Sequence, residues 1–209
     1  MHRKIATLTL VALAATAANA AEPYVGVGYQ AGAARVERNS LRYPVIDGRT
    51  LDQSGHDSVS SVRVLAGIRF SDRWSLEAAF QQPTLEASFE QDIVGTDDDE
   101  EWESSIRSTH VSLAPVFQHR LSARAALRVS AGLLYGDYKV RRTHAIDVDN
   151  GPDEVLSRAG DSDSKLGAMA GVGVTLRTPW KVDALAEVLH QRTSVVSDSS
   201  VVLGLVYRF

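Results

Sequence analysis

The stretch Val201-Val-Leu-Gly-Leu-Val-Tyr-Arg-Phe209 decides the fold, because apolar side chains occupy every second position in it. Residues two apart lie on the same face of a β-strand, so this pattern predicts a strand with one continuous apolar face. That face carries Leu203, Leu205, Tyr207 and Phe209. A strand of this kind can close a membrane barrel or a soluble sheet, and the remaining sequence has to distinguish the two.

The first 20 residues have the parts of a secretory signal. Residues 2–4 are basic, residues 5–15 are apolar, and Ala18-Asn19-Ala20 forms a small-residue cleavage site. The alternative is an uncleaved membrane anchor, but a spanning helix needs about 20 apolar residues, more than this stretch supplies. We therefore expect residues 1–20 to be removed and residues 21–209 to form one domain.

The composition limits the class of protein and its partners. The mean hydropathy of −0.11 is that of an ordinary soluble protein, which is also typical of membrane barrels because their apolar residues alternate with polar ones. The formal net charge of −4 becomes −6 once Arg3 and Lys4 are removed with the signal, so general attraction to nucleic acid is not expected. The absence of cysteine excludes disulfides, a lipid-modified cysteine and thiolate metal sites.

Period-two alternation recurs in eight segments, which we predict to be strands. They are residues 24–34, 59–70, 74–82, 106–117, 125–138, 165–176, 180–190 and 200–209. Although 23% of the chain is charged, one face of each segment has no charged residue along its apolar part, which runs from Thr109 to Phe117 in the fourth segment and from Leu127 to Tyr135 in the fifth. An Arg or Lys in the middle of a bilayer costs about 2–4 kcal/mol, so this exclusion predicts a face in hydrocarbon. Pro115 cannot donate a ladder hydrogen bond and predicts a bulge or irregularity in its strand.

The opposite face combines glycines with charges and is predicted to line the interior of the barrel. An eight-stranded barrel is only wide enough inside for side chains, so long charged residues need small neighbours, and enclosed opposite charges need to pair. Such residues could form a structural plug or a path for protons or ions. The charged residues of this face are Arg63, Arg69, Glu77, Arg128, Lys181, Asp183, Glu187 and Arg208.

The predicted connections alternate between short and long. Short turns fall at residues 71–73, 119–123 and 177–179, and long polar connections at 35–60, 82–105 and 141–164, with a briefer one at 191–199. In membrane barrels the short turns and both termini are periplasmic and the long loops are external. The aromatic residues then form two belts: Phe70, Trp74, Phe117, Trp180, Tyr207 and Phe209 at the inner ends, and Tyr29, Phe80 and Tyr135 toward the outer ends.

Four motifs give the chain a resemblance to small outer-membrane barrels of the OmpA, OmpX and opacity type: residues 24–29, 62–70, 74–80 and 203–209. The last of them resembles the sorting signal of such proteins. The resemblance implies an all-β, eight-stranded antiparallel up-and-down transmembrane β-barrel in the outer membrane. It also implies a monomer without cofactor, inserted by the barrel assembly machinery among outer-membrane lipids and lipopolysaccharide. A soluble lipocalin-like barrel, with an apolar interior, is the rival fold.

The resemblance implies a structural or surface-interaction role, in adhesion or resistance, through the external loops. Basic residues in the loops could contact lipopolysaccharide phosphates or an acidic host polymer through guanidinium groups. The acidic residues 97–101 could collect divalent cations, although they lack the spacing of a calcium loop. The basic residues are Arg35, Arg38, Arg42 and Arg49 in the first loop, and Lys139, Arg141 and Arg142 at the third.

Two other functions remain open, a narrow channel and an enzyme. Some outer-membrane barrels of this size act on lipid A with a His and Ser pair, and His110-Val-Ser112 places two such side chains on one face of a strand. That face is the predicted interior, however, and Leu113 stands where the lipid A deacylases have Asn. We therefore predict no catalytic residue, and no metal site.

Overall fold

The computed structural model describes residues 21–36, 45–46, 49–50, 57–92, 99–148 and 154–209. Within these ranges every regular element is a β-strand, and no helix is long and apolar enough to cross a membrane. The long strands are β1 (Glu22–Val36), β4 (Asp57–Arg69), β5 (Trp74–Gln81), β6 (Thr84–Asp92), β7 (Asp99–Arg120), β8 (Ala125–Asp147), β9 (Glu154–Leu176), β10 (Val182–Arg192) and β11 (Val196–Arg208). A short hairpin pairs β2 (Val45–Ile46) with β3 (Arg49–Thr50).

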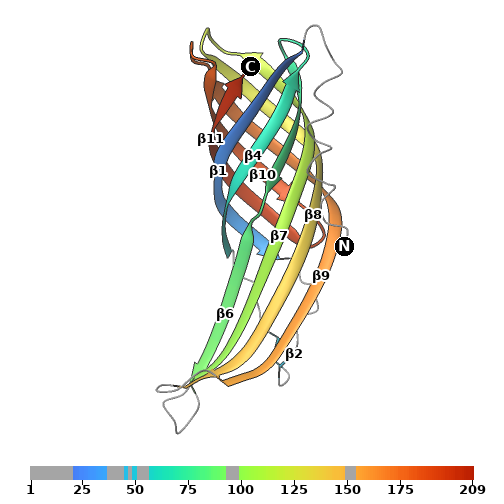
Figure 1. The fold of residues 1–209 in the computed structure, drawn as a ribbon, viewed down its shortest axis with the longest axis vertical. Helices are drawn as coiled ribbons and strands as arrows, with labels where there is room; N and C mark the ends of the chain where they lie inside the picture. Colours follow the sequence, from blue (N-terminus) through green and yellow to red (C-terminus); the bar gives the residue numbers. More distant parts are fainter. Residues whose placement is uncertain (1–20, 37–44, 47–48, 51–56, 93–98, 149–153) are drawn as a thin grey trace.

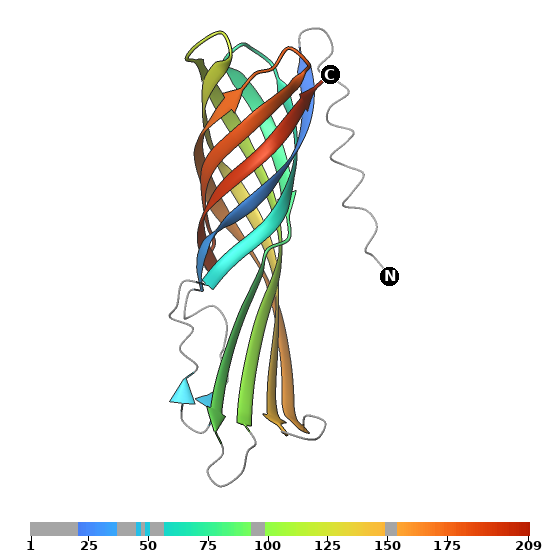
Figure 2. The same ribbon diagram turned by 90° about the vertical axis from the view of Figure 1, so that its left-hand side faces the viewer.

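The strands form an antiparallel sheet in the order β5-β4-β1-β11-β10-β9-β8-β7-β6, and β5 also pairs with β7. That last pairing closes a ring through β1, β4, β5, β7, β8, β9, β10 and β11, which confirms the predicted barrel (Figures 1 and 2). The described strands nearest the two ends of the chain, β1 and β11, meet along a seam from Tyr24↔Arg208 to Val36↔Val196. The ninth strand of the sheet, β6, follows β5 after Gln82-Pro83 and pairs only with β7.

An extension of the sheet projects beyond the ring at the end opposite the C-terminus (Figures 1 and 2). It consists of β6 and the outer parts of β7, β8 and β9, which have 22 or 23 residues each, whereas β10 has 11. The prediction that residues 82–105 and 141–164 are loops is therefore wrong for most of their described part. Outside the bilayer neither face needs to be apolar, so these strands are held by backbone pairing and lack the alternation that marks a membrane strand.

The predicted faces of the barrel are confirmed. The charge-free face points outward, with Leu133 66% exposed, while Arg128 on the opposite face is 3% exposed. A lipocalin-like barrel would have the reverse arrangement. Other large apolar side chains exposed on the outside include Val27, Val64, Phe80, Leu166, Val172, Val188, Leu203 and Leu205.

The interior also contains apolar layers that the sequence did not predict. One buried cluster, near the end of the barrel where β1 begins and β11 ends, includes Tyr24, Leu65 and Leu185. Another lies at the outer mouth and includes Leu85, Ile106 and Tyr138. These residues were missed because several of them stand inside continuous apolar runs. In such a run the period-two pattern does not show that the inward-facing positions are apolar as well. The charged residues of the interior are thus enclosed by apolar packing.

Pro115 interrupts the ladder between β7 and β8 without a change of register. The pairs of the ladder pass from Leu113↔Leu133 to Val116↔Ser130, and neither Ala114 nor Pro115 has a partner in β8, although both pair with β5. An irregularity was predicted, and it is present as a local loss of pairing and not as a bulge.

Gly132 lies in β8 beside this interruption, and we expect its replacement by alanine to destabilise the barrel. A Cβ atom there would lie 2.6 Å from the Ala114 Cα atom, which belongs to the backbone and cannot move aside. Overpacking of this kind costs about 1–3 kcal/mol. Urea unfolding in detergent micelles measures the change. Gly160→Ala is the matched control, because a Cβ at Gly160 has the Val140 carbonyl oxygen at 3.6 Å as its single neighbour; equal losses in the two variants would contradict the explanation.

Candidate functional site

A cluster of buried charges lies in the middle of the barrel and joins four strands. The Arg128 Nη2 atom of β8 is 2.6 Å from Glu77 Oε1 of β5, and Arg128 Nε is 3.3 Å from Glu187 Oε1 of β10. The Ser130 hydroxyl donates to Glu187 Oε1 at 2.8 Å, and the Tyr24 hydroxyl of β1 donates to Glu77 Oε2 at 3.2 Å. One guanidinium group thus pairs with two carboxylates, which both have further donors, and the buried guanidinium group of Arg63 supplies a second positive charge near them.

Glycine provides the room for this cluster, as the sequence led us to expect for the interior. A Cβ atom on Gly171 of β9 would lie 2.6 Å from the Ser130 hydroxyl oxygen. The space beside Glu187 is therefore available because β9 has no side chain at this position.

A layer of amides adjoins the charges on the outer side. Arg63 Nη1 donates to Gln81 Oε1 at 3.1 Å, and Gln81 Nε2 donates to Gln191 Oε1 at 2.6 Å. His110 Nδ1 lies 3.3 Å from Gln81 Nε2, and its ring meets Tyr138 edge to face at 5.6 Å. The two glutamines were missed because a neutral amide gives no charge signal and its partners come from other strands.

The His110 and Ser112 pair has no hydrolase geometry. Both side chains are buried in the interior, at 3% and 4% exposure. Within the part of the chain that the structure describes, no hydrogen bond joins them, and no group of three or more His, Asp or Glu residues could hold a metal ion.

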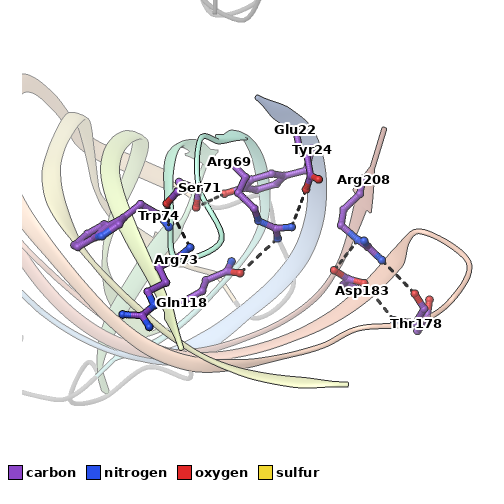
Figure 3. A network of polar contacts seen from close by, with 11 residues as sticks. Glu22, Tyr24, Arg69, Ser71, Arg73, Trp74, Gln118, Thr178, Asp183 and Arg208 are labelled. Carbon is purple, nitrogen blue, oxygen red and sulfur yellow. Dashed lines mark hydrogen bonds and ion pairs between the residues drawn. The ribbon is translucent and has the colours of Figure 1, made fainter. Parts of the chain in front are cut away.

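A second polar network lies at the end of the barrel where β1 begins and β11 ends (Figure 3). Arg208 Nε is 3.0 Å from Asp183 Oδ2, and Arg208 Nη2 donates to the Thr178 carbonyl at 3.2 Å. Arg69 Nη1 is 3.1 Å from Glu22 Oε2, and Arg69 Nη2 donates to Gln118 Oε1 at 3.4 Å. Arg69, Asp183 and Arg208 were assigned to the same interior face as the central cluster, but they form separate pairs at this rim.

Lys181 departs from the predicted interior set. It is exposed and lies in the turn before β10, with a φ of 63°, so the strand begins one residue after it. The alternation that placed Lys181 inside therefore does not extend to this position. Trp180 belongs to the same turn and is 80% exposed.

The residues of the proposed sorting signal form one outward face of β11. Leu203, Leu205, Tyr207 and Phe209 are all exposed, and the rings of Tyr207 and Phe209 meet edge to face at 5.2 Å. Their role in sorting stays a prediction.

The outward face of the extension is hollowed and carries unpaired basic residues. A hollow of about 1210 Å³ is lined by Arg107 of β7, Lys139 and Arg141 of β8, and Arg158 of β9, together with three carboxylates. Arg107 stands directly opposite Lys139 in the β7–β8 ladder. Arg158 was missed because its segment was predicted as loop, and Arg107 was missed although it lies just inside the predicted strand 106–117.

Other basic residues named from the sequence do not join this hollow. Arg142 has the opposite orientation in β8 and is part-buried, and Arg35 is exposed at the end of β1. Arg38 and Arg42 lie outside the described residues, and the side chain of Arg49 is likewise not described.

The acidic stretch continues into the start of β7. Residues 97–98 lie outside the described ranges, but Glu100 Oε1 is 2.7 Å from His144 Nε2 of β8. Trp102, which pairs with His144 across the β7–β8 ladder, stacks its ring on the same histidine, with ring centroids 4.9 Å apart. The described part of this stretch is thus built into the sheet.

A closed ring of strands with an apolar exterior and a charged interior defines a protein of the outer-membrane β-barrel class. The chain belongs to the family described as "Outer membrane protein beta-barrel domain", whose model matches residues 5–209. It is an outer-membrane protein of a Gram-negative type. No curated protein matches the sequence.

Solved structures with the same fold have little sequence in common with this chain. Neisserial surface protein A matches with a TM-score of 0.52 at 15% identity, over 91% of this chain and 100% of its own. Ail of Yersinia pestis, in complex with the heparin analogue sucrose octasulfate, matches with a TM-score of 0.50 at 18% identity and the same coverage. OprG from Pseudomonas aeruginosa matches with a TM-score of 0.52 at 8% identity, over 91% of this chain and 96% of its own.

Proposed function

We propose that this protein is a closed barrel that binds anionic groups at the cell surface through the outward face of its β6–β9 extension. The anionic groups are the phosphates of lipopolysaccharide or the sulfates and carboxylates of a host polymer. Such binding is a surface-interaction role of the kind that adhesion or resistance requires. The protein carries it out as a monomer and without catalysis.

The row of basic residues on the extension carries this proposal. Like charges directly opposite each other in a sheet are destabilising, yet Arg107 faces Lys139 across the β7–β8 ladder, and Arg141 follows on the same face. In the described structure none of the three makes a side-chain hydrogen bond or ion pair. An anion in the hollow would satisfy them, and arginine binds phosphate and sulfate groups through two parallel hydrogen bonds.

Two further observations support the proposal. The row continues the outward face of the barrel wall beyond the aromatic residue Tyr135, so it lies near the charged groups of the outer leaflet. Ail, which has the same fold, binds a sulfated heparin analogue, and we extend that class of ligand to this chain. The filled interior, with its paired charges between apolar layers, supports a structural plug over a channel.

The test compares binding of the folded protein, in maltoside micelles, to immobilised heparin and to lipopolysaccharide. Neutralising the row with Arg107→Gln, Lys139→Gln and Arg141→Gln should weaken binding by about tenfold or more, since each charge-assisted contact contributes about 1.5–3 kcal/mol. Added salt should weaken binding by the wild-type protein, because exposed charges are screened.

The acidic residues of the same hollow provide a control variant, for which the expected change in binding is the opposite. Neutralising its three carboxylates with Glu86→Gln, Asp137→Asn and Asp161→Asn should strengthen binding. The polymer that binds more tightly identifies the source of the anion. Unchanged binding of both polymers after removal of the three basic charges would refute the proposed function.

A further inference from the structure

A second basic site lies at the opposite end of the barrel, where β1 begins and β11 ends. A hollow of about 670 Å³ is lined by five arginines and two carboxylates. The arginines come from the ends of β4, β7 and β11 and from the adjoining turns, and Figure 3 shows three of them, Arg69, Arg73 and Arg208. This surface is distinct from the extension and from the central charge cluster.

The carboxylates nearby are already committed to two of the arginines. Glu22 pairs with Arg69, and Asp183, which adjoins the hollow, pairs with Arg208. Asp72 in the β4–β5 turn is the remaining acidic residue of the lining. Arginines 73, 120 and 177 have no ion pair within the described residues, so the hollow holds an excess of positive charge.

Arg177 shows the strain of this arrangement most directly. It follows β9, and its backbone N–H donates to the Arg124 carbonyl at 2.7 Å, which fixes it beside the β7–β8 turn. Its Nε atom is buried and has no hydrogen-bond partner. Burial lowers the pKa of its guanidinium group, the neighbouring charges of Arg69, Arg208 and Arg120 lower it further, and the carboxylate of Asp183 partly offsets them. A buried donor without a partner costs about 1–3 kcal/mol, and more when it is charged.

We propose that this hollow is a binding site for a phosphate-type oxyanion on the periplasmic side. A phosphate group offers acceptors to several guanidinium groups at once, and its negative charge would reduce the repulsion among the arginines that line the hollow. Two sources have this chemistry: the head group of a phospholipid in the inner leaflet, and a soluble phosphate or phosphate ester of the periplasm.

The test follows the arginine Nε–H resonances of the folded, ¹⁵N-arginine-labelled protein in maltoside micelles, which contain no phosphate. Inorganic phosphate is titrated in one arm and short-chain phosphatidylglycerol in the other, with chloride at equal ionic strength as the reference. We expect a saturable shift of the Arg177 and Arg69 resonances. Arg177→Gln should weaken the response of Arg69 by about tenfold, as expected for one lost charge-assisted contact.

Arg124→Gln is the matched control, because Arg124 is exposed at the same end of the barrel and does not line the hollow. Arg120→Gln provides a second test if Arg177→Gln does not fold, which a heat-dependent gel shift reports. Tighter binding of the lipid assigns the site to a head group, and binding of phosphate alone assigns it to a soluble anion. A response that chloride reproduces, or one that Arg124→Gln reduces equally, overturns the proposal.

Discussion

Replacement of Arg128 by methionine is expected to lower the free energy of unfolding by about 3–5 kcal/mol, the typical cost of removing one partner from a buried ion pair. The change removes the ion-pair partner of Glu77 and Glu187, which are at most 4% exposed, and leaves these two buried carboxylates against the single charge of Arg63. Urea titration in phospholipid vesicles, followed by tryptophan fluorescence and by the gel shift, measures the loss. The effect is large because two carboxylates lose the same partner.

A compensated variant separates the charge effect from the loss of packing. Glu77→Gln, added to Arg128→Met, removes one of the two carboxylates but keeps an oxygen acceptor for the Tyr24 hydroxyl. One buried carboxylate, Glu187, then faces one buried guanidinium group, Arg63, so the charges balance and the double variant should regain most of the stability. If the double variant is as unstable as Arg128→Met alone, Arg128 acts through packing and the ionic explanation is wrong.

Replacement of Val172 by arginine should cost about 2–4 kcal/mol, because it places a charge on the hydrocarbon-facing side of β9. Val172 is 54% exposed on that side and pairs with Val129 of β8 and Val188 of β10, which share the same apolar face. The measurement is equilibrium folding into vesicles of defined acyl-chain length.

Ser164→Arg is the control for this prediction, on the same strand and the same face. Ser164 lies eight residues nearer the extension, roughly 26 Å along the strand, and stands opposite Asp137. Its replacement should have little effect, since the cost of a charge falls to about 0–1 kcal/mol near the interface. Equal destabilisation by the two arginines would show that Val172 does not face hydrocarbon.

The barrel could be predicted from the sequence because the bilayer imposes one rule on every strand within it. Leu133 and Val172 obey that rule, and so their neighbours at intervals of two were assigned correctly. The extension could not be predicted in this way, because no bilayer requires one face of its strands to be apolar and charge-free, so basic residues such as Arg107 and Arg158 occur on the outward face.

The candidate sites were predictable to a lesser degree. The period-two alternation placed four charged residues inside the barrel: Arg63, Glu77, Arg128 and Glu187. It could not predict which of them form ion pairs, because those contacts depend on the register of β5, β8 and β10. Lys181 was misplaced because one left-handed residue ends the alternation just before β10. The arginine hollow brings together the ends of strands far apart in the sequence, for which no local pattern exists.

The seam between β1 and β11 has a consequence for the order in which the barrel assembles. It joins Tyr24 to Arg208, whereas the β7–β8 and β9–β10 hairpins join residues a few positions apart at their turns. Contacts between segments so distant in sequence lose the most chain entropy before any pairing energy is gained, and they form slowly. We therefore expect the hairpins to form early and the seam to close last, so that the final intermediate is an open sheet whose two unpaired edges are β1 and β11.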